Sequence, residues 1–164
     1  MSQDPAKPLA GTKIQFTGND RMLIVASRYN QSYVDHLLKR CKETLLAAGL
    51  PESQIAVVRV PGAGEIPVAI AKGIHWDDTM NPPPFAVAIA LGMVIAGETP
   101  HHEVIAHSTA NALQELATRY RVPVINGIIV TNNNAQADDR VYGAQDRGKE
   151  FADTAVEMFR IFNR

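Results

Sequence analysis

Short apolar runs alternate with longer stretches of helical periodicity along most of the chain. Apolar runs bounded by turn residues are typical of buried strands, whereas apolar residues three and four positions apart are typical of amphipathic helices. These patterns predict strands at residues 22–27, 54–60, 85–92 and 122–130, and helices at about residues 31–48, 65–74, 100–119 and 146–162. Because strands and helices alternate, the sequence predicts a four-stranded parallel sheet with helices on both faces, joined by right-handed crossovers, in a three-layer α/β/α sandwich.

Two of the predicted helices carry an apolar face that should pack on the sheet. In the helix at 31–48 this face consists of Val34, Leu37, Leu38, Cys41, Leu45 and Ala48. In the C-terminal helix the residues expected to be buried are Ala152, Ala155, Val156, Phe159 and Phe162. The run FAVAIALG at 85–92 is apolar on both faces, which indicates a central strand of a parallel sheet.

The length of 164 residues suffices for one domain with a sizeable core. We expect a flexible N-terminal segment over residues 1–20 and a single domain over residues 21–164, because the start of the chain, MSQDPAKPLAG, is polar and contains proline. This start lacks the apolar stretch of a secretory signal. The longest apolar run, residues 85–97, is shorter than the roughly 18–20 residues that span a bilayer, so no membrane partner is expected.

The balance of charge narrows the choice of partners. The formal net charge is −1, from 16 basic and 17 acidic residues, and no basic stripe is present. Neither nucleic acid nor an anionic membrane surface is therefore an expected partner. The single cysteine, Cys41, cannot form an intramolecular disulfide, which fits a reducing compartment and a cytoplasmic location. Its place on an apolar helix face favours a core residue over a reactive thiol.

Candidate chemistry lies in the loops that follow the four predicted strands. These loops contain SRYNQS, VPGAGEIP, GMVIAGETPH and NGIIVTNNNAQ, and all contain glycine, asparagine or other residues that are typical of tight turns. In open α/β sheets, ligands bind beyond the carboxyl ends of the strands. The loop pattern therefore indicates a ligand site at this end of the sheet.

The third loop belongs to the stretch LGMVIAGETPHHEVIAH, where an apolar run is followed by a helix start. Thr99 suits the N-cap and Pro100 the first helical position. The N–H groups of residues 97–99 would then point beyond the helix end, where the helix dipole favours an anion such as phosphate. His101, in the first turn, would reach the group that carries the anion. Spacing alone favours a surface histidine in a well-capped helix, because such caps are common.

A metal site is not expected in this segment. HEVIAH, at residues 102–107, resembles the zinc pattern H-E-x-x-H but has one residue too many. Histidines five positions apart lie about 140° apart around a helix, at roughly 100° per residue. His102 and His107 therefore cannot face the same ion.

Several motifs occur in a telling order and spacing: SRYN, VPGAGEIP, LGMVIAGETPHHEVI, VPVINGIIVTNNNAQA, and DDR followed by DRGKEFADTAVEM. In these motifs the chain resembles the lumazine synthases (6,7-dimethyl-8-ribityllumazine synthases) over residues 23–158. The combination of VPGAxEIP with LGxVIxGETxH at this separation is highly specific. The resemblance implies a flavodoxin-like subunit that assembles into homopentamers or larger pentamer-based shells, with active sites between subunits.

The resemblance also implies a reaction, the penultimate step of riboflavin biosynthesis. In that step 5-amino-6-(D-ribitylamino)uracil condenses with 3,4-dihydroxy-2-butanone 4-phosphate to 6,7-dimethyl-8-ribityllumazine, releasing phosphate and water. The implied partners are small-molecule substrates, with no metal and no organic cofactor.

Roles for individual residues follow from the resemblance. His101 matches the catalytic histidine, and imidazole titrates near neutral pH, as acid–base work requires. Glu103 matches an acidic position that can orient this histidine. The phosphate-binding positions are Gly97, Glu98, Thr99 and Arg140. The positions that contact the pyrimidine and its ribityl chain are Tyr29, Ala63, Gly64, Glu65, Met93, Val94, Ile95 and Asn126.

From the residues alone, three of these positions have simpler interpretations. Arg140 reads as an exposed solubilising arginine and Tyr29 as a lid over the core. Glu65 reads as an acidic residue in the first turn of its helix.

Some positions depart from the family's pattern. Gly64 stands where a bulky, often aromatic residue is usual, Asn126 where a large apolar residue is common, and Ala96 where arginine is common. The segment between Arg140 and Gly148 differs in length, which leaves open whether Arg147 matches the family's lysine. These departures keep a second hypothesis open, a non-catalytic relative that binds a flavin or lumazine or forms a shell.

Overall fold

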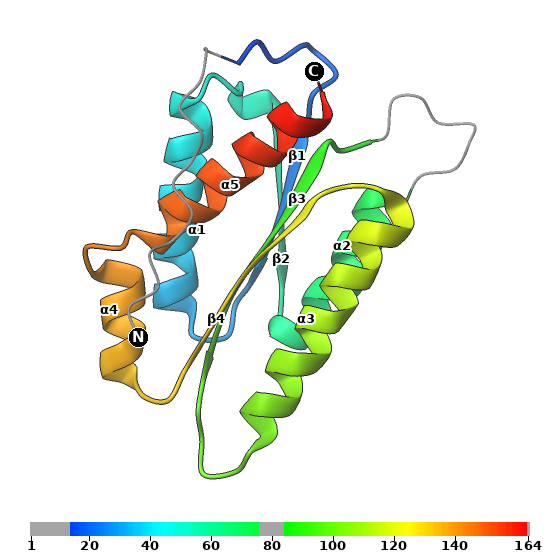
Figure 1. Cartoon of the computed structure of the whole chain (residues 1–164). Helices are drawn as coiled ribbons and strands as arrows, with labels where there is room; N and C mark the ends of the chain where they lie inside the picture. Colours follow the sequence, from blue (N-terminus) through cyan, green and yellow to red (C-terminus); the bar gives the residue numbers. More distant parts are fainter. Residues whose placement is uncertain (1–13, 76–83, 164) are drawn as a thin grey trace.

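The computed structural model describes residues 14–75 and 84–163 of the chain. In these residues a parallel sheet lies between two layers of helices (Figure 1). The strands are β1 (Met22–Ser27), β2 (Ile55–Val60), β3 (Val87–Ile95) and β4 (Val124–Thr131), in the spatial order β2-β1-β3-β4. The predicted three-layer, flavodoxin-like fold with a four-stranded parallel sheet is thus confirmed.

The helices divide between the two faces of the sheet. One face is covered by α1 (Gln31–Ala47), α4 (Asn134–Tyr142) and α5 (Arg147–Phe162). The other is covered by α2 (Ile66–Ile74) and α3 (His101–Tyr120) (Figure 1). Two short 3₁₀ turns, η1 (Glu52–Gln54) and η2 (Ala63–Glu65), flank β2.

The central strands explain the core. β1 is buried along its whole length because it lies between β2 and β3 and is covered on both faces. Its side chains alternate, so that Ile24 packs with α1 and α5 while Val25 packs with α2 and α3. The first seven residues of β3 are buried as well, which confirms the predicted central strand. Because all pairings are parallel, the loops that follow the strands meet at one edge of the sheet.

The predicted boundaries are close to the observed ones, with two differences of substance. β3 continues three residues beyond the predicted end, to Ile95, because these residues still pair with β4. The helix α4 was not predicted. It is short and polar, and its buried residues are Ala137 and Val141, a single pair four positions apart that gives no extended periodicity.

The predicted helix faces are largely confirmed. The buried residues of α1 are Val34, Leu37, Cys41 and Leu45, and those of α5 include Ala152, Ala155, Val156 and Phe159. Leu38 and Ala48 are only partly buried. The prediction that Phe162 is buried is wrong, because its side chain is 67% exposed. Phe159, one turn earlier, already fills the inward position, with its ring centroid 4.9 Å from that of Phe16.

Residues 14–20 make contacts with the domain that follows. Ile14 and Phe16 pack against the core, and Gln54 Nε2 donates a hydrogen bond to the carbonyl of Thr17 at 2.8 Å. Residues 1–13 of the expected N-terminal segment lie outside the described residues. Among the described helices, none has the length and apolar character needed to cross a membrane.

Candidate active site

The loops at the carboxyl ends of the strands are tied to one another. The N–H groups of Arg28 and Tyr29 donate to the carbonyls of Val60 and Pro61 at 2.8 and 2.9 Å, which joins the first loop to the second. Asn30 Nδ2 donates to the carbonyl of Met93 at 3.0 Å, which joins the first loop to β3. The carboxyl end of the sheet is therefore one connected framework.

Tyr29 stands at the surface of this framework. Its side chain is 73% exposed, so the alternative of a lid over the core does not hold. The next residue, Asn30, has a left-handed backbone with a φ of 54°, a conformation that asparagine tolerates better than most residues. The exposed ring is available to stack on a flat ligand.

The second loop forms the 3₁₀ turn η2. Ala63 is buried, whereas Gly64 and Glu65 are exposed. The Glu65 carboxylate accepts a hydrogen bond from the N–H of Gly62 at 2.8 Å, so it stabilises its own turn. This agrees with the simpler interpretation of Glu65 as an acidic residue at the start of its helix. A Cβ atom added to Gly64 would lie 3.9 Å from Cδ1 of Ile105 in α3. The turn thus faces the first part of α3.

Met93, Val94 and Ile95, which were predicted to form the floor of the ligand pocket, are the last three residues of β3. Met93 is buried, whereas Val94 and Ile95 are partly exposed. Their backbones pair with residues 129–131 of β4, and the N–H of Ala96 donates to the carbonyl of Thr131 at 2.8 Å. The end of β3 is therefore held in place by its pairing with the end of β4.

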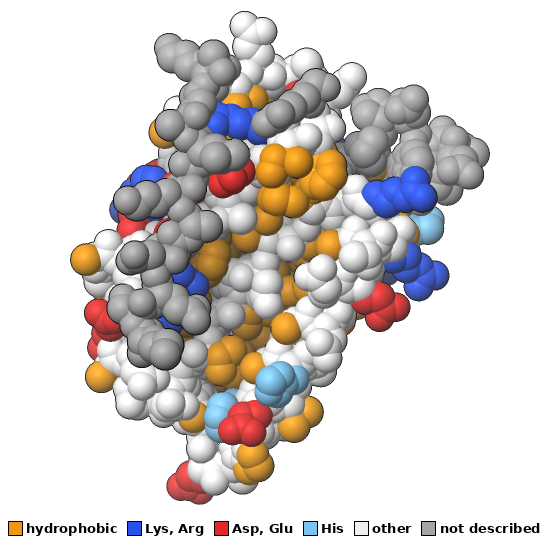
Figure 2. Space-filling model, viewed as in Figure 1, with side chains coloured by type: hydrophobic (Ala, Val, Ile, Leu, Met, Phe, Trp, Pro, Cys, Tyr) orange, Lys and Arg blue, Asp and Glu red, His pale blue; other side chains and the backbone are white. Residues whose placement is uncertain are grey.

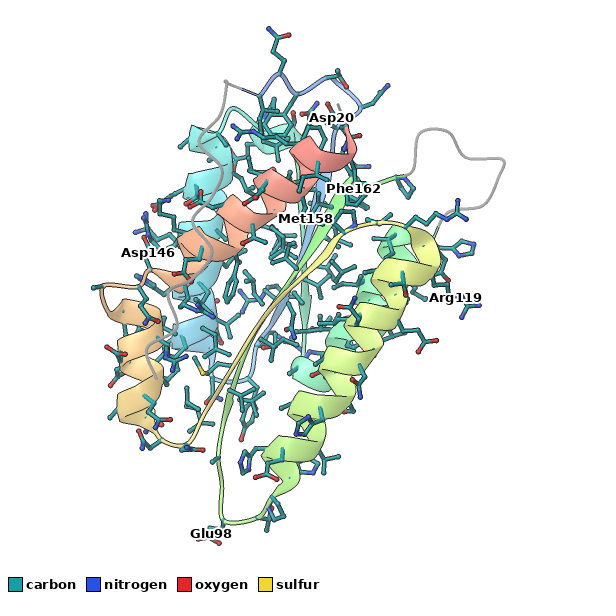
Figure 3. All side chains as sticks on the ribbon, viewed as in Figure 1. Asp20, Glu98, Arg119, Asp146, Met158 and Phe162 are labelled. Atoms are coloured by element: carbon teal, nitrogen blue, oxygen red, sulfur yellow. The ribbon has the colours of Figure 1, made fainter. Side chains whose placement is uncertain are left out.

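The loop between β3 and α3 presents free donors at the tip of the molecule, where Glu98 lies (Figure 3). Residues 97–99 are exposed, and their N–H groups donate no hydrogen bond within the described part of the chain. A Cβ atom added to Gly97 would meet nothing within 4 Å. These donors precede the N-terminus of a long helix, where the dipole favours an anion.

The predicted N-cap of α3 is wrong. The helix begins at His101, one residue later than predicted, and Thr99 makes no side-chain cap. Instead the carbonyl of Pro100 accepts from the N–H of Glu103 at 3.0 Å, and the carbonyl of Thr99 lies 3.2 Å from His102 Nδ1. The carbonyl of Pro100 thus accepts the first hydrogen bond of the helix, and the Thr99 hydroxyl is left free for another partner.

His101 is exposed in the first turn of α3. Neither a hydrogen bond nor an ion pair holds its ring in the part of the chain that the structure describes. The expected contact between Glu103 and His101 is absent from these residues. The imidazole is thus open to solvent and to a ligand.

Arg140 lies on α4, the helix that sequence reasoning missed. Its side chain is exposed and makes no hydrogen bond or ion pair with other described residues. The helix has a clear start: Asn133 Oδ1 accepts from the N–H of Gln136 at 2.9 Å, and Gln136 Oε1 accepts from the N–H of Asn132 at 2.8 Å. The spacing of asparagine and glutamine in NNNAQ is the sequence signal of such a cap.

The helix that bears Arg140 is fixed to α1. Tyr33 Oη donates to Asp138 Oδ1 at 2.8 Å, and this hydrogen bond raises the pKa of Tyr33. The ring of Tyr142 lies against Tyr33 and His36, with centroid distances of 5.6 and 4.8 Å. Arg140 therefore projects from a helix with a defined position.

A groove of about 1060 Å³ runs along β4 between α3 and α5. Figure 2 shows this face hollowed, with apolar side chains along its floor. Its lining includes Asn126 and Arg147. Asn126 Oδ1 accepts from the N–H of Ile128 at 3.1 Å, and Arg147 pairs with Glu150 at 2.6 Å. Neither Tyr29 nor His101 lines this groove, so one chain does not gather all the predicted site residues in one cavity.

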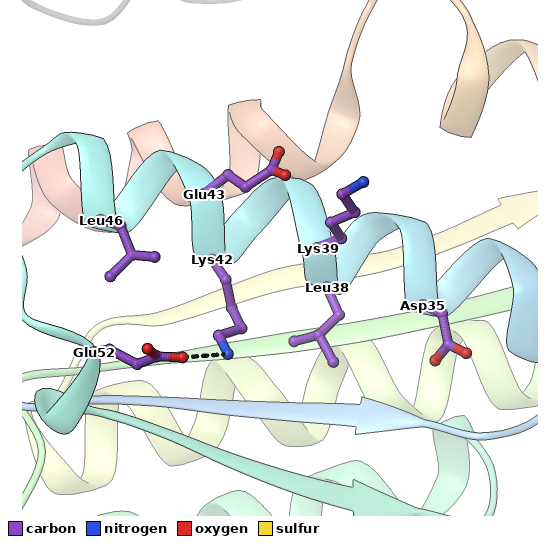
Figure 4. A pocket seen from close by; sticks show the side chains of 7 residues that line it. All are labelled: Asp35, Leu38, Lys39, Lys42, Glu43, Leu46 and Glu52. Atoms are coloured by element: carbon purple, nitrogen blue, oxygen red, sulfur yellow. Dashed lines mark hydrogen bonds and ion pairs between the residues drawn. The ribbon is translucent and has the colours of Figure 1, made fainter.

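Another pocket, of about 390 Å³, lies beside α1 (Figure 4). It contains the ion pair of Lys42 and Glu52, at 3.2 Å, with Leu38 and Leu46 on either side. None of the predicted site residues lines it. Among the residues that the structure places, no group of three or more histidine, cysteine or acidic side chains is arranged to hold a metal ion.

Comparison with known proteins places the chain among its relatives. The family model described as 6,7-dimethyl-8-ribityllumazine synthase matches residues 19–163. A 6,7-dimethyl-8-ribityllumazine synthase of Nitrosomonas europaea is 40% identical over 138 residues, which cover 84% of this chain and 79% of the relative.

Two further relatives carry the same name. The one from Polaromonas sp. (strain JS666) is 37% identical over 140 residues, covering 85% of each chain. The one from Rhodopirellula baltica is 38% identical over 149 residues, covering 88% of this chain and 92% of the relative. The family match spans all four strands and the segments that bear Tyr29, His101 and Arg140. The chain belongs to the 6,7-dimethyl-8-ribityllumazine synthase family.

Proposed function

We propose that the chain condenses 5-amino-6-(D-ribitylamino)uracil with 3,4-dihydroxy-2-butanone 4-phosphate to 6,7-dimethyl-8-ribityllumazine, a transferase step of riboflavin biosynthesis. The observation that carries this proposal is the family match over residues 19–163, which includes the loop of free N–H donors and His101. In the reaction the 5-amino group attacks the ketone and forms an imine with loss of one water, phosphate is eliminated, and closure of the second ring releases a second water. These steps require an anion site, a proton shuttle and a flat surface for a heterocycle.

The phosphate would bind between the N-terminus of α3 in one subunit and Arg140 on α4 of a neighbouring subunit. The free N–H groups of residues 97–99 and the hydroxyl of Thr99 would donate to its oxygens at the N-terminus of α3. Arg140 would add a charge-assisted contact, since its guanidinium has no competing partner among the described residues. Glu98 would contribute its backbone and not its carboxylate, because two anions repel.

His101 would move protons during the reaction. It stands two residues beyond Thr99, next to the proposed phosphate site, and its ring is exposed. An imidazole there would accept the proton that the attacking amine loses and return it to the hydroxyl that leaves as water, and it would then take the C3 proton as phosphate leaves. Much of the rate enhancement would come from holding the two substrates together, since proximity alone contributes greatly to bimolecular condensations.

The pyrimidine would stack on the exposed ring of Tyr29. Its edge and ribityl chain would contact the backbone of Ala63, Gly64 and Glu65 and the end of β3 at Met93, Val94 and Ile95. Asn126 would close the site from the side of β4.

We further propose that the site is completed between subunits of a homopentamer or a larger pentamer-based assembly. His101 and Arg140 lie on helices that cover opposite faces of the sheet, and the groove along β4 has an apolar floor. A groove of this kind is suited to receive a second copy of the chain. We place the protein in the cytoplasm, where a lone buried thiol such as Cys41 stays reduced.

Incubation of the purified chain with both substrates tests the proposal directly. We expect the fluorescence of the lumazine to appear together with inorganic phosphate. A specific observation also supports the second candidate, a non-catalytic binder: Gly64 leaves one wall open, and the Asn126 amide is engaged by its own strand. Binding of added lumazine or flavin without any product formation would favour that candidate over the enzyme.

A further inference from the structure

The loop that carries Tyr29 is placed by its backbone and not by packing of the ring. The side chain of Tyr29 is 73% exposed, and its ring pairs with no other aromatic ring among the described residues. The loop is short, since it joins Ser27 at the end of β1 to Gln31 at the start of α1. Whatever fixes the two ends of this loop therefore also fixes the position of the ring.

Arg59 of β2 contacts the strand that precedes the loop and the helix that follows it. Its Nη2 donates to the carbonyl of Ser27 at 3.1 Å, and its Nη1 donates to Asp35 Oδ1 at 2.6 Å. Ser27 is the last residue of β1, and Asp35 lies in the second turn of α1. The guanidinium is planar and holds its donors at fixed angles, so these two contacts fix the strand end relative to the helix.

The charges and the burial of this pair support a specific role. The Arg59 side chain is 29% exposed, and its Nε is buried without a partner in the described part of the chain. The hydrogen bond from Arg59 is the largest cause that lowers the pKa of Asp35. Lys42, which lies on α1 like Asp35, forms an ion pair with Glu52 of η1 at 3.2 Å (Figure 4) and makes no hydrogen bond to the loop that carries Tyr29.

We propose that Arg59 is a positioning residue for the pyrimidine side of the active site, where it fixes the loop that carries Tyr29. This inference rests on the proposed function. Arg59 acts through Tyr29 and touches no substrate itself. Without Arg59 the hydrogen bond from the N–H of Tyr29 to the carbonyl of Pro61 remains, so the loop persists but samples more positions. The consequence is weaker binding of the aromatic substrate, while binding of the phosphate substrate is unchanged.

Steady-state kinetics of Arg59→Met test this inference. We expect the KM for 5-amino-6-(D-ribitylamino)uracil to rise roughly three- to tenfold, the range that loss of such hydrogen bonds produces. The KM for the butanone phosphate and kcat should change by less than about twofold, since no group that contacts this substrate moves. Arg59→Lys should recover only part of the affinity, because an ammonium cannot hold two acceptors in a fixed geometry. Lys42→Met is the matched control and should match the wild type.

A double-mutant cycle separates positioning from a general loss of stability. In a Tyr29→Ala background, Arg59→Met should add little to the KM for the pyrimidine, because the ring that it positions is gone. Asp35→Asn weakens the same ion pair at a partly exposed helix position, so it gives the answer if Arg59→Met does not fold. Equal effects of Arg59→Met with and without the Tyr29 ring would overturn the proposal.

Hydrogen exchange gives a readout that does not depend on catalysis. The N–H groups of Arg28 and Tyr29 should exchange faster in Arg59→Met, while the rest of β1 keeps its protection. Unchanged exchange there, with unchanged KM values, would also overturn the proposal. If the wild-type chain formed no lumazine, the proposed function would fall. Faster exchange in the variant would then still assign Arg59 to the loop but not to pyrimidine binding.

Discussion

The guanidinium of Arg40 binds the carboxylate of Asp146 through two of its nitrogens. Nη2 lies 2.7 Å from Oδ2, and Nε lies 3.1 Å from the same oxygen. Asp146 also caps α5, where its Oδ1 accepts from the N–H of Lys149 at 3.4 Å, and its φ of 42° is left-handed. A contact from α1 thus holds the turn between α5 and the helix that bears Arg140.

Substitution of Asp146 should therefore lower stability. We expect Asp146→Ala to cost about 1–2 kcal/mol in the free energy of unfolding, because alanine loses the cap and tolerates a left-handed backbone poorly. Asp146→Asn keeps a cap oxygen and a tolerant backbone and loses only the charge, so its cost should be smaller. Urea titrations of the two variants measure both values. A loss no greater for alanine than for asparagine would contradict this account of the turn.

The same pair predicts a dependence on pH. The hydrogen bond from Arg40 is the largest cause that lowers the pKa of Asp146 below its ordinary 3.8. A carboxyl group with a lowered pKa in the folded state stabilises the fold above its ordinary pKa, and this contribution is lost as pH falls through the lowered value. The stability difference between wild type and Asp146→Asn should thus be constant near neutral pH and shrink below about pH 4.

Replacement of His101 should affect turnover and leave the fold unchanged. We expect His101→Ala to reduce kcat by about a hundredfold or less, at or below the low end of general acid–base contributions, because proximity supplies much of the rate. The exposed ring contributes little to the core, so assembly and melting temperature should match the wild type. His102→Ala is the control: its ring contacts the carbonyl of Thr99, and it should matter less. A steady-state rate unchanged by His101→Ala would remove the histidine from the mechanism.

Arg140→Ala should act on one substrate. Loss of a charge-assisted phosphate contact should raise the KM for the butanone phosphate far more than that for the pyrimidine. Inorganic phosphate should compete with the butanone phosphate in the wild type and more weakly in the variant. Arg119→Ala, an exposed arginine at the far end of α3 (Figure 3), should leave both values unchanged. An equal rise of both KM values in Arg140→Ala would point to a structural role for Arg140.

The space at Gly64 can be filled. Its φ lies outside the left-handed range, and an added Cβ atom would lie in ordinary contact, 3.9 Å from Ile105. We expect Gly64→Phe to fold and to lower the KM for the pyrimidine by adding apolar contact. Gly127→Ala is a contrasting variant that should lose stability, because its Cβ atom would lie 2.5 Å from the carbonyl oxygen of Ala90. Weaker pyrimidine binding in Gly64→Phe would show that the open wall is needed.

The sequence predicted the sheet and its long helices because burial imposes periods of two and of about 3.6 residues on them. It failed at α4, where burial of Ala137 and Val141 alone leaves no period to detect, although Asn133 and Gln136 carry a capping signal. It failed again at Thr99, where a good capping residue is overruled by the turn at Pro100.

The residues of the candidate site were predicted from motifs, but the contacts that hold these residues in place were not predicted. Motif spacing located Tyr29 in the loop after β1 and His101 at the start of α3, and it singled out Arg140 without predicting the helix that bears it. The hydrogen bonds from Arg59 and from Arg40 join residues far apart in sequence, 32 positions for Arg59 to Ser27 and 106 for Arg40 to Asp146. No local pattern reports such contacts, so the groups that position the site became visible only in the structure.

The last prediction concerns the sharing of the site between subunits. His101 lies on α3 and Arg140 on α4, and these helices pack on opposite faces of the sheet. We therefore expect the phosphate to be held by residues 97–99 of one subunit, next to the His101 of that subunit, and by Arg140 of a neighbour. His101→Ala and Arg140→Ala subunits should each be weak alone and should complement one another when they are co-expressed.

The expected recovery follows from the geometry of a closed ring. In a head-to-tail cyclic interface each site takes His101 from one subunit and Arg140 from the next. With equal amounts of the two variants mixed at random, about one quarter of the sites contain both native residues. Activity near that fraction of wild type, well above either variant alone, would support a shared site. Mass spectrometry of the intact assembly shows whether the rings are mixed, and mixed rings without recovery would mean that both residues act within one chain or that catalysis does not use them.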